Sequence, residues 1–166
     1  AADGTVLVGR SAGENITSAA GNTAVGYFAG STLTTGASNV VVGYDAMRNS
    51  HLGCDKNVVI GRGAFYNGEV DEAVFIGFNA GGDGTTTTGA NGTVGIGKSV
   101  LNSLTDGSAN VAVGSNAGKN ITGGDNNTLV GYFANYNGGN VHQTTAVGTS
   151  ALANATGNNN TALGYN

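Results

Sequence analysis

The stretch NTAVGYFA, residues 22–29, decides the fold of this chain, because close copies of it recur along all 166 residues. Each copy has an apolar or threonine-containing triplet, then a glycine, and usually an alanine three residues later. The repeat glycines are Gly9, Gly26, Gly43, Gly61, Gly77, Gly97, Gly114, Gly131, Gly148 and Gly164. Neighbouring glycines are separated by 17, 17, 18, 16, 20, 17, 17, 17 and 16 residues. A period this short leaves room for one turn of chain per repeat, so the sequence predicts a stack of coils.

The composition also favours a thin stack over a globule. Only 10% of the residues are charged and 7% are aromatic, whereas 31 are glycine and none is proline. Proline lacks the backbone N–H that a ladder of stacked coils requires. A hydrophobic content of 39% without a G-X-Y period argues against both disorder and collagen. We therefore interpret residues 1–166 as one β-solenoid repeat domain.

Each repeat is expected to open with a short β-strand. The positions one and three before the glycine hold Val, Ile, Leu or Thr in every repeat. Most of these residues are β-branched and favour extended structure, and residues two apart point to the same side of a strand. We expect these two columns to face the core and the apolar middle column to face outward, against another subunit. The predicted oligomer interface consists of Leu7, Val41, Val59, Phe75 and Leu129.

The rest of each repeat predicts a return segment and a polar row. A column of alanines after the glycine, followed by pairs such as Ile121-Thr122, predicts a second short strand that crosses back over a narrow core. Asparagine directly precedes the first strand in six repeats, at Asn22, Asn39, Asn57, Asn110, Asn127 and Asn160. Stacked asparagines at equivalent turns hydrogen-bond from coil to coil, so we expect a ladder there.

The pattern N-[TV]-x-[VI]-G-x-x-A, with segments such as GNTAVGYFAG and GNNNTALGY, resembles two groups of repeats. These are the head repeats of trimeric autotransporter adhesins of the YadA type and the arrays of phage and viral tail-fibre proteins. The resemblance covers the entire chain. It implies an all-β, left-handed parallel β-roll of about ten coils, three chains side by side, and an attachment role at an extracellular cell or virion surface.

Candidate ligand-binding residues lie in two places. The position after each glycine is often aromatic or basic, as at Arg10, Tyr27 and Tyr132, and a spacing of ~4.8 Å makes such a column either a platform for sugars or a self-stacking cover. The repeat is also irregular between Gly43 and Gly97, and irregular loops often form a binding face, although neutral drift of tolerant loops is the alternative. The predicted ligand-binding residues are Tyr44, Arg48, His51, Asp55, Lys56, Arg62, Phe65 and Tyr66.

Several function classes are disfavoured by the sequence. A net charge of −4 without a basic run argues against a nucleic-acid partner. The apolar stretches are shorter than the ~20 residues of a membrane span, so we expect no membrane insertion. His51 and His142 lie several coils apart, Cys54 is the only cysteine, and no nucleophile or metal-ligand motif occurs. We therefore expect no enzymatic activity, catalytic residue, cofactor or metal.

Two functions remain open. The first is a trimeric fibre segment that presents its loops to a host receptor or a surface glycan. The second is a structural filament subunit whose coils stack head to tail. The end segments AADGTVLVG and TALGYN carry no atypical capping repeat, and exposed sheet edges recruit matching strands, which favours head-to-tail stacking.

Overall fold

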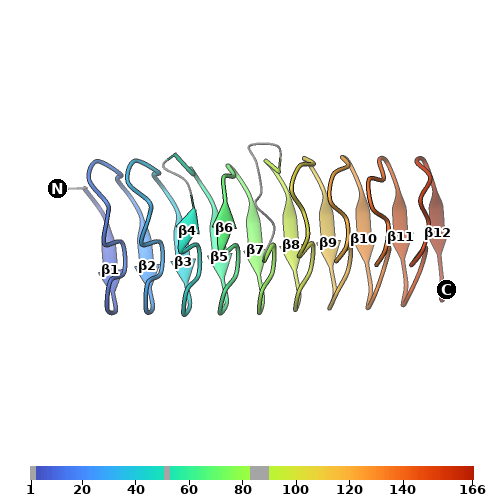
Figure 1. The fold of residues 1–166 in the computed structure, drawn as a ribbon, viewed down its shortest axis with the longest axis horizontal. Helices are drawn as coiled ribbons and strands as arrows, with labels where there is room; N and C mark the ends of the chain where they lie inside the picture. The colour runs from blue at the N-terminus through green and yellow to red at the C-terminus, as the bar shows by residue number, and fades with distance from the viewer. Residues whose placement is uncertain (1–2, 51–52, 83–89) are drawn as a thin grey trace.

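The computed structural model describes residues 3–50, 53–82 and 90–166 and shows a parallel β-solenoid (Figure 1). The strands that form its main sheet are Val6–Val8 (β1), Thr23–Val25 (β2), Val40–Val42 (β3), Val58–Ile60 (β5), Val74–Ile76 (β7), Val94–Ile96 (β8), Val111–Val113 (β9), Thr128–Val130 (β10), Thr145–Val147 (β11) and Thr161–Leu163 (β12). They pair in that order, each in parallel with the next, over about nine turns of chain. The predicted parallel solenoid is confirmed. The part of the chain that the structure describes contains no α-helix, and hence no helix that could cross a membrane.

The strand residue that faces the core is the middle one, two positions before the repeat glycine. Val41, Val59 and Phe75 are 0% exposed within the single chain, and so is Leu129. Leu7, in the first coil, has a neighbouring coil on one side only and is 44% exposed. The prediction that this column faces outward and forms an oligomer interface is therefore wrong. The two columns that flank it point outward instead.

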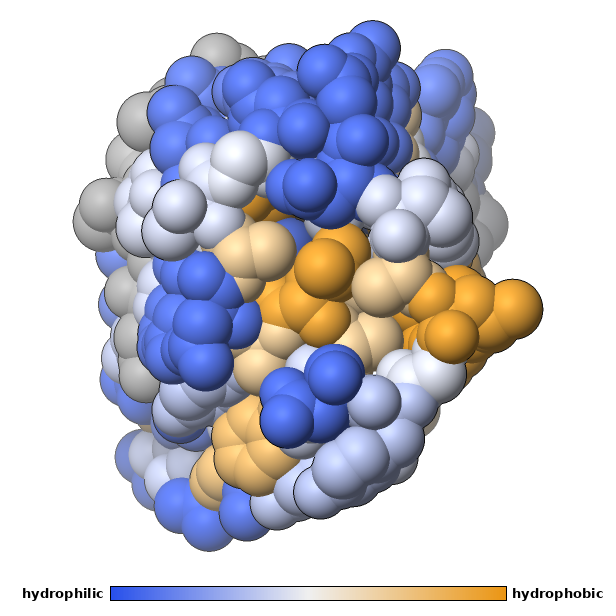
Figure 2. Space-filling model, turned by 90° about the vertical axis from the view of Figure 1, so that its right-hand side faces the viewer, coloured by the Kyte–Doolittle hydropathy of each residue, from blue (hydrophilic) through white to orange (hydrophobic). Residues whose placement is uncertain are grey.

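Packing in the core explains why the middle column varies in size. Phe75 stacks on Phe65 with ring centroids 5.1 Å apart. In the next coil, Gly95 pairs in register with Phe75, and a Cβ atom at Gly95 would lie 2.9 Å from the phenylalanine ring. A large side chain in one coil is thus accommodated by a small residue in the next, as expected of a close-packed interior. Figure 2, which shows the C-terminal end of the rod, has hydrophobic residues in the middle of the cross-section and hydrophilic residues around much of its edge.

The repeat glycine is required by close approach of neighbouring coils. At Gly43 the φ angle is +142°, which side-chain-bearing residues rarely adopt. A Cβ atom there would lie 2.4 Å from the carbonyl oxygen of Gly61 in the next coil. The same contact recurs at Gly61, where the distance to the oxygen of Gly77 would be 2.2 Å. Any other residue would push the coils apart.

The return segment after the glycine consists mainly of turns, so the predicted second strand is wrong for most coils. Residues two and four positions after the glycine have positive φ, for example Phe28 at +53° and Gly30 at +56°. These two positive φ angles point the N–H groups of Phe28 and Gly30 at opposite neighbouring coils. The N–H of Phe28 donates to the carbonyl of Arg10 in the preceding coil at 3.0 Å, and that of Gly30 donates to Ala46 in the following coil at 3.0 Å. Among the described residues, only Asn49–Ser50 (β4) and Asn67–Gly68 (β6) form a return-segment sheet.

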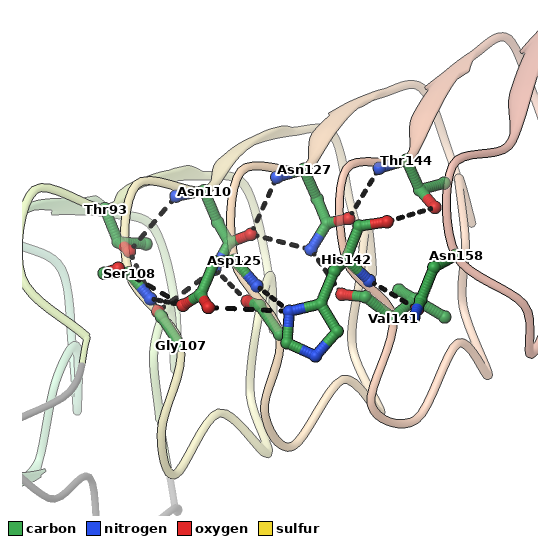
Figure 3. Close-up of polar contacts among 11 residues, drawn as sticks. Thr93, Gly107, Ser108, Asn110, Asp125, Asn127, Val141, His142, Thr144 and Asn158 are labelled. Carbon is green, nitrogen blue, oxygen red and sulfur yellow. Dashed lines mark hydrogen bonds and ion pairs between the residues drawn. The ribbon is translucent and has the colours of Figure 1, made fainter.

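Buried asparagines join neighbouring coils as predicted in two runs, Asn22–Asn39–Asn57 and Asn110–Asn127, whereas the amide of Asn160 donates within its own turn to Gly157. The backbone N–H of Asn39 donates to Oδ1 of Asn22 at 2.8 Å, and Nδ2 of Asn39 donates to the carbonyl of Cys54 at 2.7 Å. Asn57 repeats the arrangement one coil later, with its N–H 2.9 Å from Oδ1 of Asn39. Ala73 interrupts the ladder by supplying no acceptor. The same position in later coils holds Thr93, Asn110, Asn127 and Thr144 (Figure 3).

Replacing Asn127 with alanine should lower the free energy of unfolding by about 2–4 kcal/mol, because two buried groups would lose their partners. These are the N–H of Thr144, 2.9 Å from Oδ1, and the carbonyl of Val141, 2.8 Å from Nδ2. The variant should still fold, since Ala73 occupies an equivalent position. Denaturant unfolding followed by circular dichroism measures the change. Asn137→Ala, which removes only exposed amide contacts, is the control and should change stability by less than about 0.5 kcal/mol. Equal losses in both variants would contradict the proposed role of the buried ladder.

Candidate ligand-binding site

A row of aromatic and basic side chains runs along the rod, contributed by the residue that follows each repeat glycine. Tyr27 and Tyr44 are stacked, with ring centroids 5.1 Å apart and ring planes 19° apart. The guanidinium of Arg10 lies 5.7 Å from the centroid of Tyr27. Arg62 lies between two rings, 5.7 Å from Tyr44 and 5.9 Å from Phe78. The column expected from the sequence therefore exists and stacks on itself over five successive coils.

A pocket of about 240 Å³ opens beside this row, and we call it the Arg62 pocket. Its lining residues are Tyr44, Asp45, Arg62, Gly63, Tyr66, Phe78 and Asn79. Tyr44 and Phe78 are 49% and 45% exposed, so solvent reaches part of both aromatic residues here. The residues that line the pocket thus combine aromatic side chains with a guanidinium, a carboxylate and an amide.

The charges around the pocket leave Arg62 available. Asp45, the carboxylate in the lining, pairs with Arg48 at 3.0 Å, and Arg48 also lies 4.2 Å over the ring of Phe28. Within the described ranges, no carboxylate forms an ion pair with Arg62. The negative charge of Asp45 is thus balanced by Arg48, and Arg62 brings to the pocket a positive charge that forms no ion pair with any residue of the described ranges.

The structure brings together only some of the residues predicted to bind a ligand. Tyr44, Arg62 and Tyr66 line the pocket, and Arg48 lies next to it, bound to Asp45. Phe65 is 0% exposed and belongs to the core, so its predicted role in binding is wrong. The sequence already placed Phe78 in one column with Tyr44 and Arg62. Sequence reasoning did not add Asp45, Gly63 and Asn79, although each follows a repeat glycine by two positions.

Asp55 and Lys56 lie away from the pocket, because β5 separates them from Arg62. Oδ1 of Asp55 accepts the N–H of Ala37 in the preceding coil at 2.7 Å. Lys56 forms a solvent-exposed ion pair with Glu72 at 2.8 Å, which raises the pKa of the ammonium and lowers that of the carboxyl. These two residues therefore serve coil-to-coil contacts. His51, also predicted to bind a ligand, lies outside the described residues.

A second ladder, formed in the turn before the strands by side chains equivalent to Asp55, explains the role of His142 (Figure 3). Oδ1 of Asp125 accepts the N–H of Ser108 at 2.7 Å, and in the next coil Nδ1 of His142 accepts the N–H of Asp125 at 3.1 Å. The N–H of His142 donates in turn to Oδ1 of Asn158 at 3.0 Å. Each side chain thus satisfies an N–H of the preceding coil, and the imidazole replaces a carboxylate or an amide.

Reactive chemistry finds little support at these ladders. A polar groove of about 350 Å³ lies beside Asp125 and His142, but the described part of the chain holds no cluster of three His, Cys, Asp or Glu residues suited to a metal ion. Burial raises the pKa of the Cys54 thiol to about 11, so this cysteine is protonated at neutral pH and is a poor nucleophile.

The Asp125 ladder should contribute to stability only above acidic pH. The hydrogen bond from the Ser108 N–H, aided by its hydroxyl and by His142, holds the pKa of Asp125 below its usual value. A carboxyl with a lowered folded-state pKa stabilises the fold above its unfolded pKa of about 3.9, and this contribution is lost as the pH falls through the folded-state pKa. Asp125→Asn keeps an acceptor oxygen for Ser108 but cannot titrate. We therefore expect its melting temperature, measured by circular dichroism from pH 7 to pH 2, to fall less steeply in acid than that of the unmodified chain. An identical acid slope in both proteins would contradict this role, and Asp106→Asn, at an exposed carboxylate of the same groove, is the control.

Comparison of the chain with protein-family models, with curated proteins and with solved structures finds no match. Its function must therefore be inferred from its own residues and their arrangement.

Proposed function

We propose that this chain is a segment of an extracellular fibre that self-associates side by side through the outward face of its main sheet and serves attachment at a cell or virion surface. The observation that carries the proposal is the composition of that face. Every outward strand residue is Val, Ile, Leu or Thr, along all ten strands, and none is charged. Val40, Ile96 and Val111 are 38%, 37% and 38% exposed in the single chain. An uncharged apolar strip of this length is typical of a surface that another protein covers.

The size of this outward face is sufficient for a stable interface. Ten strands supply two outward residues each. At a strand spacing of ~4.8 Å the face extends over ~43 Å, which is long enough for a standard protein interface of about 800 Å² per partner. Burying it would also remove the apolar surface from water, which is the main driving force for association.

A second copy of the chain is the partner that fits this face best. Its side-chain ridges recur at the strand spacing of ~4.8 Å, and an identical copy has ridges with the same period. Two aligned rods can therefore interlock along their whole length, which a partner without this repeat cannot do. The resemblance of the repeat to trimeric adhesin heads supports three copies in particular, with their outward faces turned towards a common axis.

The attachment role is supported by the aromatic and basic row. The row consists of the residue after each repeat glycine, so it begins where the strands and the proposed interface end. A straight rod with ten in-register strands holds such side chains in a fixed line. Rigid placement of exposed aromatic groups lowers the entropy lost when a ligand binds.

Two neighbouring residues of β5 separate self-association from folding. Val58 points outward and Val59 is 0% exposed. Val58→Asp should leave the β-rich circular dichroism spectrum intact but convert the oligomer to monomers, because it places unpaired charges in an apolar interface. Val59→Asp should instead unfold the chain, because it buries a carboxylate in the core.

Sedimentation velocity measures the state of association of each variant, and circular dichroism measures whether it is folded. We expect the unmodified chain to sediment at about three times its 16.2 kDa mass and Val58→Asp at the mass of one chain. A monomeric unmodified chain, or a Val58→Asp variant that stays assembled, would contradict the proposal. Rods whose length increases with concentration in electron micrographs would favour a head-to-tail filament instead.

A further inference from the structure

We propose that the Arg62 pocket binds a carboxylate-bearing sugar unit of an acidic glycan. The guanidinium of Arg62 takes the carboxylate, and the exposed rings of Tyr44 and Phe78 pack against the sugar ring. This inference rests on the proposed attachment function and names the class of ligand that the attachment site recognises.

The aromatic side chains of Tyr44 and Phe78 are the reason for proposing a sugar. A pyranose ring has a patch of C–H groups on one face and hydroxyls around its edge, so it packs on an exposed aromatic face while its hydroxyls stay hydrogen-bonded. Tyr44 and Phe78 are about half exposed and flank Arg62, so they offer apolar ring surface to a sugar beside the guanidinium. Tyr66 and Asn79 place a hydroxyl and an amide in the same lining, which suits the hydroxyl edge of a sugar.

The guanidinium of Arg62, which pairs with no carboxylate of the described residues, is the group that would bind the carboxylate of the sugar. Arginine presents parallel N–H donors that match a carboxylate with two hydrogen bonds. Arg62 is held between two rings, so little side-chain freedom remains to be lost on binding. Asp45 does not oppose an anion strongly, because Arg48 pairs with it at 3.0 Å.

The dimensions and charge of the pocket argue against other anions. A volume of about 240 Å³ is below the range of about 300–1,000 Å³ that is usual for drug-sized ligands, so it suits a single sugar ring at one point of a longer chain. A phosphate polymer would require several cations in a row, whereas the chain carries a net charge of −4 and the pocket offers one uncommitted guanidinium.

Two pairs of probes test the inference on the full chain by isothermal titration calorimetry. One pair is a tetrasaccharide of alternating glucuronic acid and N-acetylglucosamine and the same tetrasaccharide with its carboxyl groups reduced to alcohols. The other is sialyllactose and lactose. In at least one pair, the acidic member should bind at least tenfold more tightly than the neutral member.

Variants then assign the roles. Arg62→Gln should abolish the preference for the acidic probe, so that both members of the pair bind equally weakly. Tyr44→Ala should weaken both members by a similar factor, because it removes the packing surface. Arg10→Gln is the matched control: Arg10 also lies 5.7 Å from a tyrosine ring but does not line the pocket, so binding should not change.

The inference is overturned if neither acidic probe binds, if acidic and neutral members bind equally to the unmodified chain, or if Arg10→Gln loses as much affinity as Arg62→Gln. Sedimentation of the same samples separates this failure from failure of self-association. An intact oligomer without binding overturns the sugar site alone, and a monomer that binds the acidic probe supports the site while contradicting the fibre interface.

Discussion

The close approach of neighbouring coils at the repeat glycine sets the geometry of this protein. A Cβ atom at Gly43 would lie 2.4 Å from the oxygen of Gly61, so the backbones are packed as tightly as the absence of a side chain permits. This contact holds the strands in register, residue against residue, along the rod. Equivalent residues of successive coils therefore form columns along the rod, and all of these columns share the spacing that the strand register imposes.

Stability and the candidate site are both products of this register. Inside the rod, it places Asn39 directly between Asn22 and Asn57, so that buried amides satisfy one another and the backbone without help from water. At the surface, it places Tyr44 and Phe78 on either side of Arg62, although they are one coil away from it in the sequence. Stacking stabilises the buried ladder because its polar groups find hydrogen-bond partners in the neighbouring coils. The surface row gains because aromatic and cationic groups attract each other.

The period of the glycines was enough to predict the solenoid, but hydropathy could not tell which strand face is buried. Positions 58 and 59 are both valine, and only the structure shows that Val59 faces inward and Val58 outward. One usable signal was variation in volume: the change from Phe75 to Gly95 in the same column indicates neighbours that must fit together in an interior. The turns of the return segment were not predictable, because Met47 and Phe65 adopt positive φ, which neither residue prefers. Phe65 was also misassigned to the site because it lies in the irregular segment between Gly43 and Gly97, in which its neighbour Tyr66 does line the pocket.

Changes in repeat length do not reach the pocket. The intervals after Gly43 and Gly61 are 18 and 16 residues, yet β4 and β6, six residues after these glycines, still pair in register. The difference in length is therefore absorbed between this point and the next strand. All residues that line the pocket lie within five positions after a repeat glycine, in the part of the coil whose geometry is constant. If the row binds the proposed ligand, its specificity depends on which side chains occupy the row rather than on the length of the loops, and substitutions there would not disturb the register on which the rod depends.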